Sequence, residues 1–75
     1  MSIIPGKYRH YKGRLYEVLG TVRHSETLEE LVLYKALYES EEFGRDQLWV
    51  RPLPMLLEEV EVNGEHVPRF SFIAE

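Results

Sequence analysis

The feature that most constrains the fold of this sequence is a period of two in its side chains, which recurs in short runs separated by turn residues. The first run, residues 6–11, alternates long basic side chains with Tyr8 and His10. The second run, residues 15–23, carries on one side Tyr16, Val18, Gly20 and Val22. Such alternation is typical of β-strands that cover a core with one face. We therefore predict a mainly β protein in which this side of residues 15–23 faces the core.

Glycine and polar residues mark the connections between the runs. Gly13 lies where a tight turn between the first two runs needs a positive φ, and Gly20 inside the second run predicts a bulge or a sharp bend. Residues 24–30 are polar, and we expect them to form the exposed tip of a second hairpin; a helical turn capped by Ser25 or Thr27 is the alternative. Asn63-Gly64 is the strongest hairpin signal in the chain.

Residues 31–38 fit two kinds of secondary structure. As a strand they place together Val32, Tyr34, Ala36 and Tyr38. A helix over residues 29–42 competes, because leucine, alanine, lysine and glutamate are good helix formers. Valine and two tyrosines favour the strand.

The second half of the chain begins with an acidic connection, residues 39–46, and continues with a run that alternates strictly. In residues 47–51, one face carries Leu48 and Val50 and the other carries Trp49 and Arg51. Pro52 and the proline two residues later remove backbone donors, so residues 53–57 are predicted to form a single helical or 3₁₀ turn.

A chain of 75 residues has room for one hydrophobic core, so we expect a single domain over residues 1–75. The absence of cysteine from the sequence excludes disulfides, thiolate zinc sites and cysteine nucleophiles, and it fits a reducing compartment. The N-terminus lacks the pattern of a secretory signal, and no run reaches membrane-spanning length. We therefore expect a soluble cytoplasmic protein without a membrane partner.

Charge is distributed unevenly along the sequence. Residues 1–25 hold five basic side chains and one acidic one, whereas the other fifty residues hold four basic and twelve acidic ones. Two interpretations stay open: simple segregation of surface charge, or a basic first quarter that faces an anionic ligand. The net charge of −4 and the isoelectric point near 5.3 count against nucleic acid as the partner, because phosphate contacts dominate such affinities.

Several motifs occur in order across the chain: Gly-Lys-Tyr-Arg-His-Tyr-Lys-Gly (residues 6–13), Tyr-Glu-Val (16–18), His-Ser-Glu-Thr (24–27), Tyr-Lys-Ala-Leu-Tyr (34–38), Trp-Val-Arg-Pro (49–52) and Pro-Arg-Phe (68–70). On these motifs the chain closely resembles a bacterial family of unknown function, domain-of-unknown-function family 1653. The resemblance implies a single small SH3-like β-barrel of about five short strands, and no established biochemical activity. The runs and turns described above agree with such a barrel.

Trp49 and Arg51 are the sharpest candidates for a binding site, because alternation places them on one face. An exposed tryptophan beside a guanidinium can hold a planar or anionic ligand by stacking and bidentate hydrogen bonds. A surface Arg–Trp stack, or a tryptophan that covers the open end of the barrel, is the structural alternative. Grooves of SH3-like barrels often present an aromatic and polar set, here Tyr8, His10, Tyr11, Tyr34 and Tyr38, whereas Tyr16 and Tyr34 also suit the core.

The polar tip His24-Ser25-Glu26 suggests catalysis or metal binding only weakly. A nucleophile there lacks a third group that would orient the base, and a metal site with His10 and His66 lacks any ligand-spacing signature. We therefore predict no catalytic residues, no metal and no cofactor, although a small enzyme that uses the Tyr, His and Glu side chains stays open. The tip can instead supply hydrogen bonds to a ligand, or form a plain solvated turn.

Our leading hypothesis is a binding module that recognises an anionic small molecule or a peptide by stacking and charge-assisted hydrogen bonds. The predicted ligand-binding residues are His10, Arg23, His24, Ser25, Glu26, Tyr38, Trp49 and Arg51. A nucleic-acid-associated β-barrel is the alternative, disfavoured by the acidic net charge.

Overall fold

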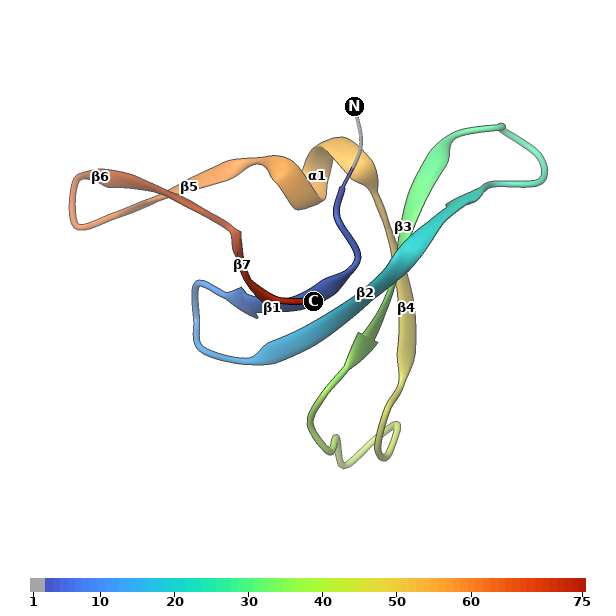
Figure 1. The fold of residues 1–75 in the computed structure, drawn as a ribbon, viewed down its shortest axis with the longest axis horizontal. Helices are drawn as coiled ribbons and strands as arrows, with labels where there is room; N and C mark the ends of the chain where they lie inside the picture. Colours follow the sequence, from blue (N-terminus) through green and yellow to red (C-terminus); the bar gives the residue numbers. More distant parts are fainter. Residues whose placement is uncertain (1–2) are drawn as a thin grey trace.

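Seven β-strands and one helical turn make up the computed structural model, which describes residues 3–75 (Figure 1). In chain order the elements are β1 (Gly6–His10), β2 (Leu15–Arg23), β3 (Glu30–Ala36), β4 (Leu48–Pro52), α1 (Leu53–Leu57), β5 (Glu59–Val62), β6 (Glu65–Pro68) and β7 (Phe70–Ala74). The mainly β class and the helical turn at residues 53–57 are confirmed. Residues 31–38 contribute a strand, so the competing helix over residues 29–42 does not form. The N-terminus, in which we expect no secretory signal, begins with Met1 and Ser2, and these two residues lie outside the described residues.

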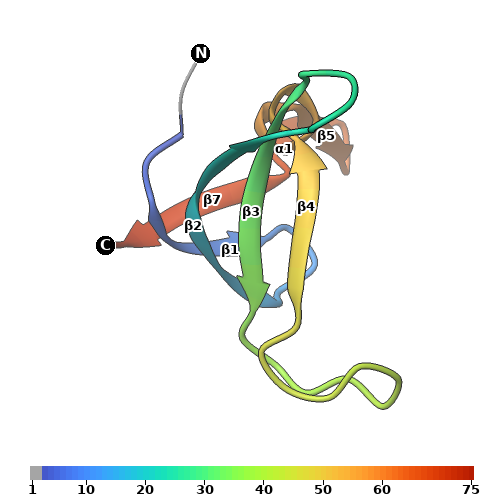
Figure 2. The same ribbon diagram turned by 90° about the vertical axis from the view of Figure 1, so that its right-hand side faces the viewer.

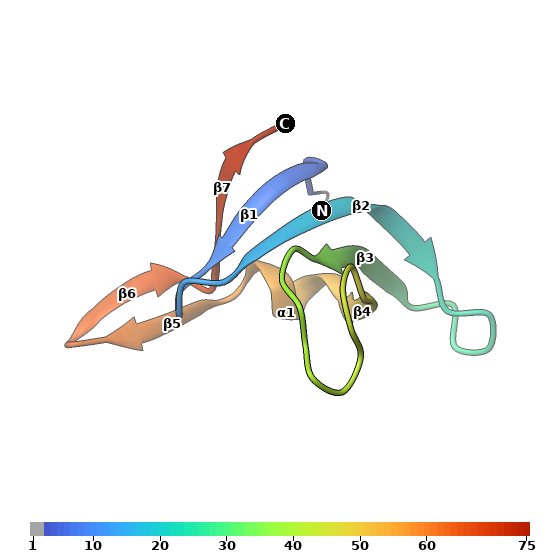
Figure 3. The ribbon, with the colours of Figure 1, turned by 90° about the horizontal axis from the view of Figure 1, so that it is seen from below.

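Five strands form one antiparallel sheet in the order β4-β3-β2-β1-β7, and β5 pairs with β6 in a separate hairpin. The sheet curls strongly, so that β1 and β7 cross behind β3 and β4 (Figure 2). Figure 3 shows the β5–β6 hairpin projecting beyond one side of the curled sheet. Within residues 3–75, β4 and β7 are the two edges of the sheet and do not pair with each other. The observed sheet is therefore open, and the closed SH3-like barrel stays an implication of the resemblance.

The core lies on one face of the curled sheet, called the inner face below. Its buried residues are Tyr8, Val18, Val32, Tyr34, Leu53, Leu56 and Phe70. Val32, at the centre of β3, is completely buried. The period of two explains the burial pattern of β1 and β3 directly. In β1, Tyr8 is buried between exposed Lys7 and Arg9. In β3, every second residue is buried: Val32, Tyr34 and Ala36. Leu53 and Leu56 of α1 cover the same core from its end.

A β-bulge in β2 corrects one prediction of the sequence. Val18 lies opposite Tyr34, but Gly20 lies opposite Leu33, so Leu19 is the extra residue on β2. The bulge that Gly20 predicts is thus present. It also reverses the alternation, because Thr21 now lies opposite Val32 on the inner face and Val22 lies on the outer face, where 38% of it is exposed. The prediction that Val22 faces the core is wrong for this reason.

Three turns close the hairpins as the sequence predicts. Gly13 has a φ of +106° between β1 and β2, and Asn63 and Gly64 have φ values of +51° and +83° between β5 and β6. Two positive φ values in succession are what a type I′ hairpin turn requires. Residues 24–29 form the exposed tip between β2 and β3 and contain no helix, so the capped helical turn is not adopted. Among residues 3–75, no helix has the length and apolarity needed to cross a lipid bilayer.

Candidate ligand-binding site on the inner face

An aromatic hollow of about 220 Å³ opens on the inner face, next to the core. It is lined by Tyr16, Tyr34, Tyr38, Trp49 and Arg51. Three neighbouring strands build it: Tyr34 of β3 lies directly opposite Trp49 of β4, and β2 contributes Tyr16. Directly opposed residues of antiparallel strands point to the same face, which explains why these rings meet. Strand register therefore places Tyr16, Tyr34, Trp49 and Arg51 around the hollow, and Tyr38, just after β3, completes its lining.

Tyr16 is the centre of the aromatic packing around the hollow. Its ring makes edge-to-face contacts with Tyr34, Phe70 and Tyr38, at centroid distances of 5.4, 5.5 and 5.6 Å. Its hydroxyl also forms a hydrogen bond of 3.1 Å with the Tyr38 hydroxyl. Burial, and next the hydrogen bond to Tyr38, raise the pKa of Tyr16 well above its usual value. Tyr16 is therefore a neutral hydrogen-bonding group at any physiological pH.

Arg51 provides a positive charge at the wall of this hollow. Its guanidinium carbon lies 5.8 Å from the centroid of the Phe70 ring, and the side chain is half-buried. Across residues 3–75 it forms neither an ion pair nor a side-chain hydrogen bond. A guanidinium carries five N–H donors in a planar fork that matches carboxylates and phosphates. Arg51 thus presents unused donors to the hollow.

Trp49 lies at the rim of the hollow, with 38% of its surface exposed. One side of the residue lines the hollow and the rest is accessible to solvent, so Trp49 is neither a core residue nor fully exposed. Its neighbours on β4, Leu48 and Val50, lie on the outer face and are 49% and 52% exposed. The sequence predicted correctly that Trp49 and Arg51 share a face, and the structure shows that this face is the inner one.

His10 lies beside the hollow, where several positive charges converge. Its ring centroid is 4.9 Å from that of Phe70, and its Nδ1 accepts a hydrogen bond of 3.2 Å from the backbone N–H of Lys12. Burial, and then the charges of Arg51, Arg69 and Lys12, lower the pKa of His10 below its ordinary value. The imidazole is therefore neutral at pH 7. The positive potential at this place comes from the guanidinium groups.

Arg69 differs from Arg51 because it already has a partner. One of its terminal nitrogens donates a hydrogen bond of 2.6 Å to a carboxylate oxygen of Glu58. Its Nε is buried and has no hydrogen-bond partner among the described residues. Arg69 thus links the start of β7 to the segment after α1, and its charge is largely compensated.

The predicted residues at the β2–β3 tip form a separate group. Arg23 donates to the backbone carbonyl of Leu28 at 2.9 Å. Nδ1 of His24 accepts hydrogen bonds from the backbone N–H groups of Glu26 and Thr27, at 3.1 and 3.3 Å. These contacts stabilise the turn itself.

Strand geometry keeps this tip away from the hollow. The tip, which includes Ser25, lies at one end of β3, and Tyr38 lies beyond the other end (Figure 1). A strand rises about 3.3 Å per residue, so the seven residues of β3 put about 20 Å between its two ends. The structure therefore brings together four of the eight predicted residues, which are His10, Tyr38, Trp49 and Arg51, and leaves Arg23, His24, Ser25 and Glu26 apart from them.

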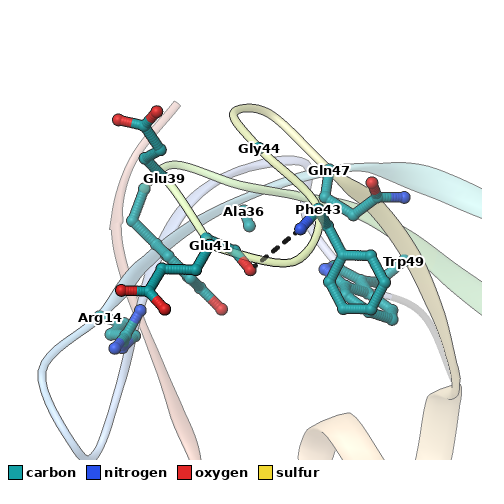
Figure 4. Close-up of a pocket in the computed structure, with 10 residues that line it drawn as sticks. Arg14, Ala36, Glu39, Glu41, Phe43, Gly44, Gln47 and Trp49 are labelled. Atoms are coloured by element: carbon teal, nitrogen blue, oxygen red, sulfur yellow. Dashed lines mark hydrogen bonds between the residues drawn. The ribbon is translucent and has the colours of Figure 1, made fainter.

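A second, larger hollow of about 510 Å³ adjoins the first and shares Tyr38 and Trp49 with it. The β3–β4 connection supplies most of its lining, and Arg14 lies with its guanidinium carbon 4.3 Å from the centroid of the Tyr38 ring (Figure 4). Two residues that line this hollow, Arg14 and Phe43, were not among the candidates predicted from the sequence. A lone aromatic residue in an acidic connection was the only signal for Phe43, and Arg14 follows the turn glycine without any distinguishing pattern.

Tyr8, a further candidate for the groove, belongs to the core instead. Only 7% of it is exposed, and its hydroxyl donates to the carbonyl of Ile4 at 2.7 Å. Within residues 3–75, no three histidine, aspartate or glutamate side chains gather closely enough to hold a metal ion.

Fold and hollow together define a small mainly β protein whose curled sheet carries an aromatic pocket with an arginine at its wall. The chain belongs to the DUF1653 family, described as a protein family of unknown function, whose model matches residues 6–72. A solved structure of a DUF1653 protein from Bordetella bronchiseptica is similar to it, with 38% sequence identity and a TM-score of 0.85. The similarity covers 96% of this chain and 88% of that one. No curated protein matches the chain.

Proposed function

We propose that this protein is a binding module that takes the anionic group of its ligand at Arg51 and an adjoining planar or apolar group in the aromatic hollow. The observation that carries the proposal is a guanidinium without a protein partner among residues 3–75, at the wall of a hollow lined by three tyrosines and a tryptophan. Ligand pockets commonly combine aromatic walls with a few placed polar groups in this way.

The surroundings of Arg51 favour an anion over a neutral ligand. Burial against Phe70 strengthens the electrostatic interaction of the guanidinium, because the local dielectric is lower than that of water. His10, next to it, is neutral and can share a hydrogen bond with the bound group. A bound anion also offsets the positive charges that lower the pKa of His10, so binding should raise this pKa and be accompanied by proton uptake in mildly acidic solution.

The test uses phenyl phosphate and benzoate as anionic aromatic probes, benzamide as a neutral one, and inorganic phosphate as an anion without a ring. Trp49 is the only tryptophan in the chain, so its fluorescence and indole NMR signal report on the hollow. We expect the two aromatic anions to give saturable changes at Trp49. Benzamide should bind at least about tenfold more weakly, since charge-assisted hydrogen bonds contribute about 1.5–3 kcal/mol. Inorganic phosphate should also bind more weakly than phenyl phosphate, because it has no ring to pack in the aromatic hollow.

Two variants sharpen the result. Arg51→Met keeps a long apolar side chain and should lower the affinity for phenyl phosphate about tenfold or more. Arg9→Met, on the exposed side of β1 away from the core, is the matched control and should bind like the natural protein. The proposal is wrong if benzamide binds as well as benzoate, or if Arg51→Met binds phenyl phosphate unchanged.

A second candidate ligand is single-stranded nucleic acid, which binds to stacking rings and arginines. Trp49, Arg14 and Arg51 lie close to Tyr38, and this arrangement favours such a ligand. The net charge of −4 weighs against it. Titration with oligonucleotides at low salt separates the two ligands: binding that falls steeply with added salt would favour nucleic acid over a small anion.

A further inference from the structure

Strand β4 is a free edge of the main sheet and borders both hollows. Within residues 3–75 it pairs with β3 on one side only, and Leu48, Trp49 and Val50 are all exposed. In Figure 2, β4 forms the outer margin of the sheet beside β3. An edge strand offers unpaired backbone groups to which an extended peptide can add as a further strand.

The hydrogen-bond pattern identifies which backbone groups of β4 face away from β3. The N–H of Ala36 donates to the carbonyl of Gln47 at 2.9 Å. In an antiparallel pair, hydrogen-bonded and non-hydrogen-bonded residues alternate, so Trp49 and Arg51 also bond to β3. Leu48 and Val50 consequently direct their N–H and C=O groups toward the open edge, where the Leu48 carbonyl accepts an exposed hydrogen bond of 3.1 Å from Nε2 of Gln47 that an added strand would replace. Pro52 has no N–H and limits the usable edge to this short stretch.

The β3–β4 connection adds a negatively charged, aromatic recess at the start of this edge. Phe43 and Trp49 pack edge to face, with centroids 5.3 Å apart and ring planes at 90°. The connection is fixed by mutual backbone hydrogen bonds between Ser40 and Gly44, of 2.8 and 2.9 Å. Phe43 is therefore held on Trp49, although 51% of it is exposed.

Carboxylates form the opposite wall of this recess. Figure 4 shows Glu39 and Glu41 across the hollow from the Phe43–Trp49 pair. Residues 39–47 contain four acidic side chains and only one arginine, Arg45, whose ion pair with Glu39 is 3.9 Å long and solvent-exposed. Aromatic faces together with carboxylates bind organic cations such as a guanidinium or an ammonium group. Arg14 also lines this hollow, so its charged lining of one arginine and two glutamates carries a net charge of −1, opposite in sign to that of Arg51.

We propose that β4 binds an extended peptide as an added antiparallel strand, with an acidic side chain of the peptide at Arg51 and a basic one in the recess of Glu39 and Glu41. The inference rests on the proposed function, because the acidic side chain is the anion at Arg51. All strand pairs of the main sheet are antiparallel, and this pairing is slightly the more stable one.

Antiparallel addition fixes the order of residues in the peptide. Opposed residues share a face, so the residues opposite Arg51 and Gln47 point to the inner face, and those opposite Val50 and Leu48 point to the exposed apolar outer face. Read from its N-terminus, the peptide is therefore acidic, apolar, small, apolar, basic. The opposite order places like charges together at both ends and is disfavoured.

The test compares acetyl-Glu-Val-Ser-Val-Arg-amide with the reversed peptide acetyl-Arg-Val-Ser-Val-Glu-amide, followed by NMR. We expect the first to bind at least about tenfold more tightly and to shift the amide signals of Leu48 and Val50. Methylation of the backbone nitrogen of its first valine, which faces Val50, should weaken binding by a similar factor. Methylation at the serine nitrogen, which points away from β4, should leave the affinity within about twofold.

Variants of the recess provide a second, independent measurement. Glu39→Gln combined with Glu41→Gln should lower affinity for the first peptide about fivefold or more, whereas Glu42→Gln, a carboxylate of the same connection outside the lining, should not change it. Equal binding of the two peptide orders, or equal effects of the two N-methyl groups, overturns the added strand.

The two proposals fail separately. Phenyl phosphate reports on Arg51 alone, and it needs neither the edge of β4 nor the recess. Binding of phenyl phosphate without binding of the first peptide overturns the added strand and leaves the proposed function in place. Peptide binding that survives Arg51→Met, with no binding of phenyl phosphate, overturns the proposed function and shows a strand-addition site that does not use the arginine.

Discussion

The hydroxyl groups of Tyr16 and Tyr38 lie 3.1 Å apart and join β2 to the segment just after β3, across 22 positions of sequence. Arg14 stacks on the same Tyr38 ring at 4.3 Å. One tyrosine thus links the wall of the smaller hollow to that of the larger one. The shape of both hollows therefore depends on a hydrogen bond between two tyrosine hydroxyl groups, and a single substitution can remove it.

Tyr38→Phe should destabilise the protein by about 1 kcal/mol, because it leaves the half-buried hydroxyl of Tyr16 without its partner. It should also lower the pKa of Tyr16, which stays above its ordinary value since burial is the larger cause. Urea unfolding and a pH titration of the tyrosine ring carbons by NMR measure the two effects. Tyr11→Phe, at an exposed tyrosine, is the control and should change neither. An unchanged titration of Tyr16 in Tyr38→Phe would contradict the structure.

The pKa of His10 makes stability depend on pH with a defined sign. Burial and neighbouring positive charges lower this pKa in the folded protein, so below about pH 6.5 the unfolded chain binds more protons than the folded one. The free energy of unfolding should therefore fall as pH drops from about 7 through the folded pKa of His10. At higher pH, His10 is neutral in both the folded and the unfolded chain and does not make the free energy of unfolding depend on pH.

Replacement of His10 by glutamine isolates this contribution from the other titrating groups. Urea unfolding between about pH 8 and about pH 5 should show a smaller loss of stability for His10→Gln than for the natural protein. His66→Gln, at an exposed histidine of β6, should follow the natural protein. Parallel curves for all three proteins would show that His10 is not the responsible group.

The bulge at Leu19 can be tested through the two faces of β2 and β3. Val22→Thr should change stability by less than about 0.5 kcal/mol, because the bulge turns Val22 to the outer face. Val32→Thr introduces a hydroxyl at a completely buried site and should cost about 2 kcal/mol or more. Thermal unfolding of the two variants makes the comparison. Similar losses for both would mean that Val22 faces the core, as a simple period of two implies.

That comparison also shows how far the sequence determines the fold. Local patterns predicted the strands and turns well, because alternation and turn residues act over a few positions. Gly20 even signalled the bulge. The pattern could not give its position, because one extra residue reverses every later side chain without changing the composition of the run.

The candidate site was predictable only where it lies along one strand. Alternation placed Trp49 and Arg51 together, but register against β3 decides that their face is the inner one. Arg14 and Phe43 reach the hollows through turn conformations and contacts between distant segments, which no local pattern encodes. His24 was predicted to meet the ligand together with Trp49 and Arg51, yet the length of β3 places it at the far end.

Gly6 should be the glycine whose replacement is least tolerated, because β7 passes directly beside it. A Cβ atom at Gly6 would lie 2.5 Å from the carbonyl oxygen of Ala74, and φ at Gly6 is +142°, a value that other residues rarely adopt. Gly13→Ala is the matched control, since Gly13 also has a positive φ but a Cβ there meets no atom within 4 Å. We expect Gly6→Ala to cost at least about 2 kcal/mol, and clearly more than Gly13→Ala, because it combines backbone strain with a displaced β1–β7 pair. Urea unfolding measures both losses, and NMR amide signals of β7 should shift in Gly6→Ala alone. Equal losses without any change in β7 would mean that the last strand does not pack against the start of β1 as the structure describes.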